Sequence, residues 1–497
     1  MRGLALTWIG AGVLAACNVP LEHYASPDAP RDASPDTDAG GTGPGMLAQR
    51  AYLKASNTDA GDGFGHAVAL SADGSTLAVG AIHEASSSGA NPASNADMDA
   101  GAVYVFRRSG QTWTQEAYVK APHPDPDDFF GHAVALSADG STLAIGAVSE
   151  DSKATGVGGD QTDNNAPAAG AVYVFTRTGT AWALEAYVKA SNTGGGDAFG
   201  QSVALSADGS TLAVGASLED SDGTTQASSG AQDSGAVYVF TRTGGLWSQQ
   251  AYVKAPIVNS FDGFGASVAL SDDGATLAVG ASFADSAMTN LGAVHVFART
   301  GTTWTPELDQ VGTGNDPIGA LGNSVALSGD GATLAVGASR EDSVSLPAQT
   351  TSGAVYLFTR SGATWTQAAH LEASIVGAGD RFGTSVSLSH DGARLLIGAP
   401  AEDGRATGLG GDPADDTAPD AGAAYLFVRS GATWSQGLYL KASNTDAGDG
   451  FGASVALSAD AATLAVGADA EASKARGVDG DETDDTAGGA GAAYVFR

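Results

Sequence analysis

Short apolar runs separated by polar turns recur along the chain. The first copy has four of them, Phe64 to Ser71, Thr76 to Ala81, Ala102 to Phe106 and Trp113 to Ala121, and all are rich in Val, aromatic and small apolar residues. Runs of this length and composition are typical of β-strands. Because no part of the unit has helical spacing, the pattern predicts an all-β unit of four strands.

The same unit occurs seven times. Each copy begins with Phe-Gly, except that the weakened fifth copy begins with Leu321-Gly322, and successive copies lie 57 to 69 residues apart. This period is longer than a WD40 blade and too long for a helical solenoid repeat. The six Phe-Gly pairs begin at Phe64, Phe130, Phe199, Phe264, Phe382 and Phe451.

The two ends of the repeat region predict how it closes. The last residues, 492 to 497, complete a third strand and then stop, whereas Ala51 to Ala55 matches the fourth-strand segment Ala117 to Ala121 but precedes the first Phe-Gly. Pairing the N-terminal strand with the last three strands would leave no open sheet edge. We therefore predict a seven-bladed β-propeller of four-stranded antiparallel blades over residues 49–497.

The turns and the outermost strands fit this fold. Ser-x-Asp-Gly turns join the first two strands, since Asp can bond its own backbone and Gly can adopt a positive φ. Pro306, in the weakened fifth copy, is tolerable only on an edge strand. We expect the lysines of the outermost strand to keep the blade edges from aggregating. They are Lys54, Lys120, Lys189, Lys254 and Lys441.

Charge excludes one class of partner. The chain has a net charge of −33, and it lacks the Lys and Arg clusters that phosphate binding requires, so nucleic acid is not expected as a ligand. The acidity favours cation binding or a soluble extracellular surface. We expect the propeller to be monomeric.

The N-terminus resembles a bacterial lipoprotein signal peptide. Arg2 is followed by a mostly apolar stretch that ends at Leu14-Ala15-Ala16-Cys17, and Cys17 is the only cysteine of the chain. The resemblance implies cleavage after residue 16, lipid attachment at Cys17, and a membrane contact through that lipid. Residues 18–48 have the Pro, Asp and Gly content of a flexible tether. We expect the protein at the bacterial outer membrane or cell surface.

Two motifs identify a family resemblance. Phe-Gly at the start of a copy and Leu77-Ala78-Val79-Gly80-Ala81 near its middle are the two halves of the FG-GAP repeat, and Leu395 to Pro400 repeats the second half. The chain resembles the FG-GAP propellers of integrin alpha subunits and bacterial surface proteins. In those repeats calcium sits in an Asp-x-Asp-x-Asp-Gly loop. Here a short Ser-x-Asp-Gly turn takes its place, so the family's calcium ligands cannot be transferred.

Long acidic loops are the candidate functional surface. In an antiparallel blade the second-to-third loops and the blade-to-blade crossovers share one face, and binding residues often lie on loops held by a rigid scaffold. Three of these loops resemble one another and offer oxygen ligands of the kind calcium prefers. Their candidate ligands are Asp160, Asp163 and Asn164; Asp412, Asp415 and Asp416; and Asp481, Asp484 and Asp485. The alternative is that these acids only keep the surface soluble.

An aspartate also precedes each Phe-Gly by two residues. Its regularity favours a structural role, the capping of nearby backbone N–H groups, over metal binding or ligand contact. The six residues are Asp62, Asp128, Asp197, Asp262, Asp380 and Asp449.

No nucleophile elbow, phosphate loop or zinc-protease motif is present in the sequence. The leading hypothesis is thus a non-enzymatic, lipid-anchored envelope module that binds a protein or glycan, with calcium as the candidate cofactor in adhesion. An extracytoplasmic hydrolase or lyase with carboxylate catalysis on the loop face is the alternative. A structural envelope protein without a ligand is the third.

Overall fold

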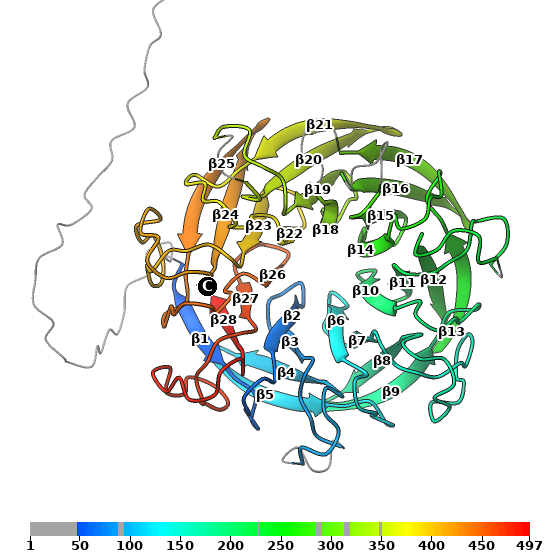
Figure 1. The fold of residues 1–497 in the computed structure, drawn as a ribbon, viewed down its shortest axis with the longest axis horizontal. Coiled ribbons are helices and arrows are strands. Elements are labelled where there is room, and N and C mark those ends of the chain that lie inside the picture. Colours follow the sequence, from blue (N-terminus) through cyan, green and yellow to red (C-terminus); the bar gives the residue numbers. More distant parts are fainter. Residues whose placement is uncertain (1–46, 88–93, 227, 285–290, 313–318, 347–349) are drawn as a thin grey trace, which may run out of the picture. The chain divides into compact units, whose positions relative to one another are not determined.

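The computed structural model describes residues 47–87, 94–226, 228–284, 291–312, 319–346 and 350–497. They belong to one compact unit, Met46–Arg497. Every sheet in this part of the chain is antiparallel and four-stranded, and the seven sheets form a closed ring, as Figure 1 shows. The all-β, seven-bladed propeller predicted from the repeats is confirmed.

The strands of the first four blades have the following bounds: β2 (Phe64–Leu70), β3 (Thr76–Ala81), β4 (Ala102–Ser109) and β5 (Thr112–Val119); β6 (Phe130–Leu136), β7 (Thr142–Ala147), β8 (Ala171–Thr178) and β9 (Ala181–Val188); β10 (Phe199–Leu205), β11 (Thr211–Ala216), β12 (Ala236–Thr243) and β13 (Leu246–Val253); β14 (Phe264–Leu270), β15 (Thr276–Ala281), β16 (Ala293–Thr300) and β17 (Thr303–Val311). The last three blades contain β18 (Leu321–Leu327), β19 (Thr333–Ala338), β20 (Ala354–Ser361) and β21 (Thr364–Leu371); β22 (Ser385–Leu388), β23 (Arg394–Ala399), β24 (Ala423–Ser430) and β25 (Thr433–Leu440); and β26 (Ser454–Leu457), β27 (Leu464–Ala468), β28 (Ala492–Phe496) and β1 (Gln49–Leu53).

The seventh blade closes the ring as predicted. The N-terminal strand β1 pairs with β28, with Tyr52 opposite Tyr494 and Leu53 opposite Ala493, and Figure 1 shows the two strands side by side. The blade therefore joins the N-terminal strand to the last three strands of the chain, which removes an open edge.

A belt of backbone hydrogen bonds joins the blades on the opposite side from the long loops. The residue after the serine of each Ser-x-Asp turn donates its N–H to the matching turn of the next blade. The belt runs through seven bonds and ends where Ala459 donates to Ala72 at 2.9 Å. The seven donors are Ala72, Ala138, Ala207, Asp272, Gly329, His390 and Ala459.

The FG-GAP glycines allow neighbouring blades to approach closely. A Cβ on Gly467 of β27 would overlap the carbonyl oxygen of Gly65 in the next blade, so only glycine fits. The same relation holds at all seven blade junctions. The pairs are Gly80 and Gly131, Gly146 and Gly200, Gly215 and Gly265, Gly280 and Gly322, Gly337 and Gly383, Gly398 and Gly452, and Gly467 and Gly65.

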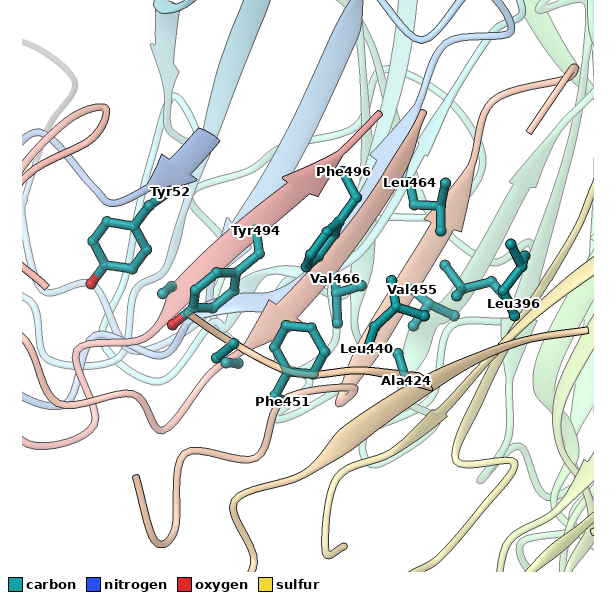
Figure 2. Packing of buried hydrophobic residues seen from close by; sticks show 14 of the residues in the cluster. Tyr52, Leu396, Ala424, Leu440, Phe451, Val455, Leu464, Val466, Tyr494 and Phe496 are labelled. Carbon is teal, nitrogen blue, oxygen red and sulfur yellow. The ribbon is translucent and has the colours of Figure 1, made fainter. Parts of the chain in front are cut away.

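The hydrophobic core lies between adjacent blades. Figure 2 shows the sixth and seventh blades, where Leu396 and Leu440 belong to the same buried cluster as Val466. Phe451, the phenylalanine of the seventh Phe-Gly, packs edge-on to Tyr494 and Phe496 at centroid distances of 5.3 and 6.2 Å. Edge-to-face contacts of this kind add to the area that each ring buries.

The weakened copy needs one correction. Pro306 lies on β17, which pairs with β16, so the altered outer strand belongs to the fourth blade and not to the fifth. The proline does stand on an outermost strand, as expected. The fifth blade differs in Leu321, which takes the buried phenylalanine position, and in Glu372, which stands at the position of the outer-strand lysine.

Two N-terminal predictions lie outside the described residues. These are the signal peptide at 1–17 with Cys17, and nearly all of the tether at 18–48. Within the part of the chain that is described, no helix has the length and apolar character needed to cross a membrane.

Candidate functional site

Four of the five lysines of the outermost strands are buried and Lys254 is half-buried, so the prediction that they protect exposed edges is wrong. Lys189 donates to Glu150 Oε2 at 2.7 Å, while the other oxygen of Glu150 accepts from Tyr187 at 2.7 Å. The glutamate comes from the second-to-third loop of the same blade and folds back over the strand end. Five blades contain this lysine–glutamate pair: Lys54 with Glu471, Lys120 with Glu84, Lys189 with Glu150, Lys254 with Glu219, and Lys441 with Glu402.

These buried charges are paired and repeated, which indicates a structural role. Burial lowers the pKa of Lys189, and the facing Glu150 carboxylate acts in the opposite direction. Burial also raises the pKa of Tyr187, with Glu150 as the second cause. A catalytic group is rarely copied into five equivalent places, so we assign the network to holding each loop against its blade.

The crossover aspartates cap the backbone, as the sequence predicted. Asp128 Oδ2 accepts the N–H of Asp125 at 2.9 Å, and each of the other five accepts the N–H three residues before it. The remaining bonds are Asp59 to Asp62, Gly194 to Asp197, Asn259 to Asp262, Gly377 to Asp380, and Asp446 to Asp449, at 2.7 to 3.2 Å.

Burial is the main cause of the raised pKa values of these aspartates. It raises the pKa of Asp128 to about 7, despite the stabilising backbone hydrogen bond and with help from nearby carboxylates such as Glu150. The same value of about 7 applies to the pKa of four other crossover aspartates: Asp62, Asp197, Asp380 and Asp449.

We therefore expect Asp128→Asn to stabilise the protein at pH 8 and to have little effect on its melting temperature below pH 3.8. The folded-state pKa of Asp128 is above its ordinary value of 3.8, so its stabilising contribution is complete below pH 3.8 and is lost progressively as the pH rises from 3.8 to about 7. Asparagine keeps the acceptor for the Asp125 amide and cannot ionise. Parallel melting curves from about pH 3.5 to 8 for both proteins measure the difference, and a constant difference would refute the assignment.

The loop acids predicted as calcium ligands are engaged in their own turns. Asp160 Oδ1 accepts the backbone N–H of Thr162 at 2.9 Å, and Asp481 does the same for Thr483 at 3.0 Å. Asp412 Oδ1 likewise accepts the N–H of Ala414 at 3.0 Å. Each side chain thus closes an Asx turn around the next two residues.

The second and third acids of these loops also have contacts of their own. Asp415 and Asp484 each accept a threonine hydroxyl two residues on, at 2.6 Å, and Asp163 accepts from Asn165. Asn164 donates to Asp125 at 3.0 Å, and Asp416 lines a cavity. Burial raises the pKa of Asp485, with the nearby Asp446 as the second cause. Among the described residues, no group of three or more His, Cys, Asp or Glu side chains is arranged to hold a metal ion.

The glycine-rich segments of the same loops have a role that sequence reasoning missed. Val157 forms an isolated antiparallel bridge with Val188, as Leu409 does with Leu440 and Val478 with Leu53. In the second blade Lys189 donates its N–H to Gly156 at 2.8 Å. These loops therefore cover the exposed edge of β9, β25 and β1, which is a recognised protection against edge-to-edge association.

One cavity on the loop face is lined by carboxylates. Its volume is about 240 Å³, and Asp380, Glu402, Asp403 and Asp416 contribute to its wall. A carboxyl group with a pKa near 7 in such a place would suit a general acid. However, Asp380 makes the same backbone bond as five other crossover aspartates, and Glu402 is committed to Lys441 and Tyr439. The chemistry of the cavity is thus explained by the repeat.

The repeat also decides the family. The model of the FG-GAP repeat family matches residues 47–106, 113–175, 182–240, 247–297, 320–358 and 365–427. The chain belongs to the FG-GAP repeat family. Its seventh copy lies beyond these matches, but the seventh blade has the same glycine contact and the same buried phenylalanine.

Other comparisons with this FG-GAP propeller are remote. No curated protein sequence matches it. Among solved structures, it is similar to Kuenenia stuttgartiensis hydrazine synthase with a TM-score of 0.47 and 15% sequence identity, over 82% of this chain and 93% of that chain. A likeness of this degree says nothing about activity.

The fourth blade of the FG-GAP propeller departs from the repeated network. Ala284 stands at the glutamate position, Val311 at the lysine position, and Asp309 at the tyrosine position on the outer strand. His295 replaces the tyrosine of the third strand and lies 3.2 Å from Asp309. Ile257 occupies the crossover position where Asn57, Asn192 and Asn444 each donate to the network glutamate.

Proposed function

We propose that this FG-GAP propeller is a non-enzymatic binding module of the bacterial cell envelope that presents its loop face to a protein or glycan. The loop face consists of the connections that follow the second and fourth strands of each blade. The observation that carries the proposal is where the charged residues lie. In five blades the buried lysine and glutamate are paired with each other in the structural network, whereas the acids of the long loops lie on one face.

The family and the scaffold support this proposal. FG-GAP propellers suggest binding or adhesion, and a rigid ring that carries variable loops is a common arrangement for recognition. The carboxylate-lined cavity was the best place for the alternative, a hydrolase or lyase. Because its two most buried acids repeat in other blades as structural groups, we favour binding over catalysis.

Attachment to the membrane is part of the proposal. Cys17 would bear the lipid, and residues 18–48 would tether the propeller at the outer membrane or cell surface. The full chain should fractionate with membranes, and Cys17→Ser should move it to the soluble fraction. Membrane association that survives this substitution would remove the lipid anchor from the account.

The proposed function is tested by the binding of the full chain to arrays of surface glycans and extracellular proteins. We expect the binding of a ligand to be lost when the acids of the long loop that it contacts are replaced by alanine, with Asp412, Asp415 and Asp416 of the sixth blade as the first set, and to survive Leu246→Ser. Leu246 begins β13 at a short turn on the opposite face and is 77% exposed, which makes it a matched surface control. Turnover of an array component would instead support the enzyme, and no binding at all would support the structural protein.

Calcium as a cofactor is a part of the proposal that can be tested separately from ligand binding. For Ca²⁺ to bind, the acids of the Asp160, Asp412 and Asp481 loops would have to exchange their Asx turns for a shared cation. Calorimetry, with melting temperatures in calcium and in chelator, tests this step. Stoichiometric heat and a higher melting temperature would support calcium-dependent adhesion. No heat and no shift would leave a metal-free binding face.

A further inference from the structure

Four large apolar side chains are exposed around the crossover that enters the fourth blade. Ile257 is 68% exposed, Phe261 56%, Phe283 44% and Leu218 43%. Ile257 and Phe261 lie on the crossover itself, Phe283 follows β15, and Leu218 follows β11 of the third blade. Single exposed apolar residues are ordinary, but a group of them on one face indicates an interaction site.

The crossover passes close to Phe283 and to the residue before Leu218 at Gly263. A Cβ placed on Gly263 would be 3.2 Å from Cδ2 of Phe283 and 4.0 Å from the carbonyl oxygen of Ser217, the neighbour of Leu218. The backbone N–H of Phe283 also donates to the carbonyl of Asp262 at 3.3 Å. The third and fourth blades thus meet here, and we call Leu218, Ile257, Phe261 and Phe283 the apolar patch.

Phe261 is held in a backbone conformation that phenylalanine disfavours. Its φ is +69°, and the equivalent position is glycine in four other crossovers, Gly61, Gly196, Gly379 and Gly448, and aspartate in another, Asp127. A bulky residue is strained in this region, and strain of this kind is concentrated at functional sites. Since more than half of the Phe261 side chain is exposed, packing within the chain does not account for it.

A comparison within the same ring strengthens this reading of Phe261. Phe129, two residues further along its own crossover, also has a positive φ, of 54°, but its ring packs edge-on to His83 with centroids 5.6 Å apart. The intramolecular contact offers a reason for Phe129. Phe261 and Ile257 instead lie at the entrance to the fourth blade, which lacks both the glutamate and the lysine of the structural network and has Ala284 and Val311 in their places.

The surroundings of the patch define the charge of its partner. Besides the buried Glu219, the loop from 217 to 235 contributes Asp220, Asp222 and Asp233, and it contains no lysine or arginine. The stretch from 255 to 298 contains none either. The nearest cation in the sequence, Lys254, is already bonded to Glu219 at 2.9 Å. An apolar surface bordered by carboxylates complements a segment with apolar anchors between basic residues.

We propose that the apolar patch of the third and fourth blades docks a cationic polypeptide segment, whose aromatic or aliphatic side chains cover Phe261 and Phe283 while its lysines or arginines face the acidic loops. This proposal rests on the proposed function, because it assigns the partner class and the place on the loop face. It concerns a protein ligand. Binding of an uncharged glycan elsewhere on the loop face would support the proposed function but not this proposal.

The experiment uses a fluorescently labelled 12-residue peptide of alternating lysine with phenylalanine or leucine, titrated with the full chain and followed by anisotropy. Two companion peptides carry glutamine in place of lysine, or serine in place of phenylalanine and leucine. We expect the first peptide to bind and both companions to bind at least about 10-fold more weakly. Phe261→Gly and Phe283→Ser should each weaken binding by about 10- to 100-fold. Leu246→Ser should leave it unchanged.

Phe261→Gly also separates a docking role from a structural one. Glycine adopts a positive φ without strain, so the melting temperature of this variant should equal or exceed that of the native protein. A lower melting temperature would make Phe261 a packing residue and overturn the proposal, as would absence of binding or equal binding by Phe261→Gly. If the patch proposal fails in one of these ways, the array experiment still shows whether the loop face binds another ligand. Failure of the patch proposal is therefore distinguishable from failure of the proposed binding function.

Discussion

Lys189→Met is expected to lower the free energy of unfolding by about 3–5 kcal/mol, among the largest effects of any single substitution in this protein. The substitution removes the cation at 2.7 Å from Glu150 and leaves that carboxylate buried, with the Tyr187 hydroxyl as its remaining partner in the network. The cost comes from the uncompensated charge, because methionine fills nearly the same space. Denaturant unfolding, or the melting temperature where unfolding is irreversible, measures the change.

Two further variants isolate the cause. Lys189→Met combined with Glu150→Gln removes both charges and keeps an acceptor for Tyr187, so it should recover most of the lost stability. Lys153→Met makes the same change of charge at an exposed position of the neighbouring loop and should have little effect. If the double variant is as unstable as Lys189→Met, the loss would come from packing and not from the buried charge.

Gly467→Ala should destabilise the ring by about 3 kcal/mol or more, since the new methyl group would overlap the Gly65 carbonyl across the junction of the seventh and first blades. Neither side can yield easily. Gly467 lies within β27, and Gly65 accepts a hydrogen bond from Ser454 at 2.6 Å. Gly488→Ala is the matched control, because a Cβ there has no atom within 4 Å and its φ is not positive.

Thermal melting and size-exclusion chromatography of both variants test this prediction. Gly467→Ala should have a lower melting temperature and elute as an expanded or associated species. If the junction between the seventh and first blades cannot close, strand edges are exposed. Gly488→Ala should behave as the native protein. An unchanged melting temperature for Gly467→Ala would mean that the blades are not in the close contact on which the fold depends.

Much of the fold could be predicted because each blade repeats its own local rules. The apolar runs mark the strands, the Ser-x-Asp-Gly turns mark the hairpins, and the displaced segment Ala51 to Ala55 reveals the closure. The backbone bonds of Asp62 and its counterparts were predictable for the same reason, since their donors lie three residues away. Local hydrogen bonds leave a signal in local sequence.

The lysine network could not be predicted from the outer strand alone. Lys189 stands at the end of an edge strand, where exposure is the usual expectation, but its partner Glu150 lies 39 residues earlier at the start of a long loop. One signal was present: a glutamate follows the second half of the motif by three residues in six of the seven copies. Its regular spacing from Gly-Ala could have suggested a structural partner.

The candidate metal loops show a similar limit. Repeated Asp residues near glycines are compatible with calcium ligands and with Asx turns, and sequence does not distinguish them. The bridge between Val157 and Val188 depends on how the loop folds back over β9, because the two residues are 31 positions apart in the sequence. The apolar patch was missed because its four residues come from three separate segments.

Hydrogen–deuterium exchange of the full chain, with and without the lysine–phenylalanine peptide, tests the central claim that binding belongs to the loop face at the third and fourth blades. The account predicts slower exchange in residues 217–226 and 256–263 on peptide addition, with no change in the turn belt around Ala72 and Ala138. Protection confined to the belt face, or spread evenly over all seven blades, would contradict it.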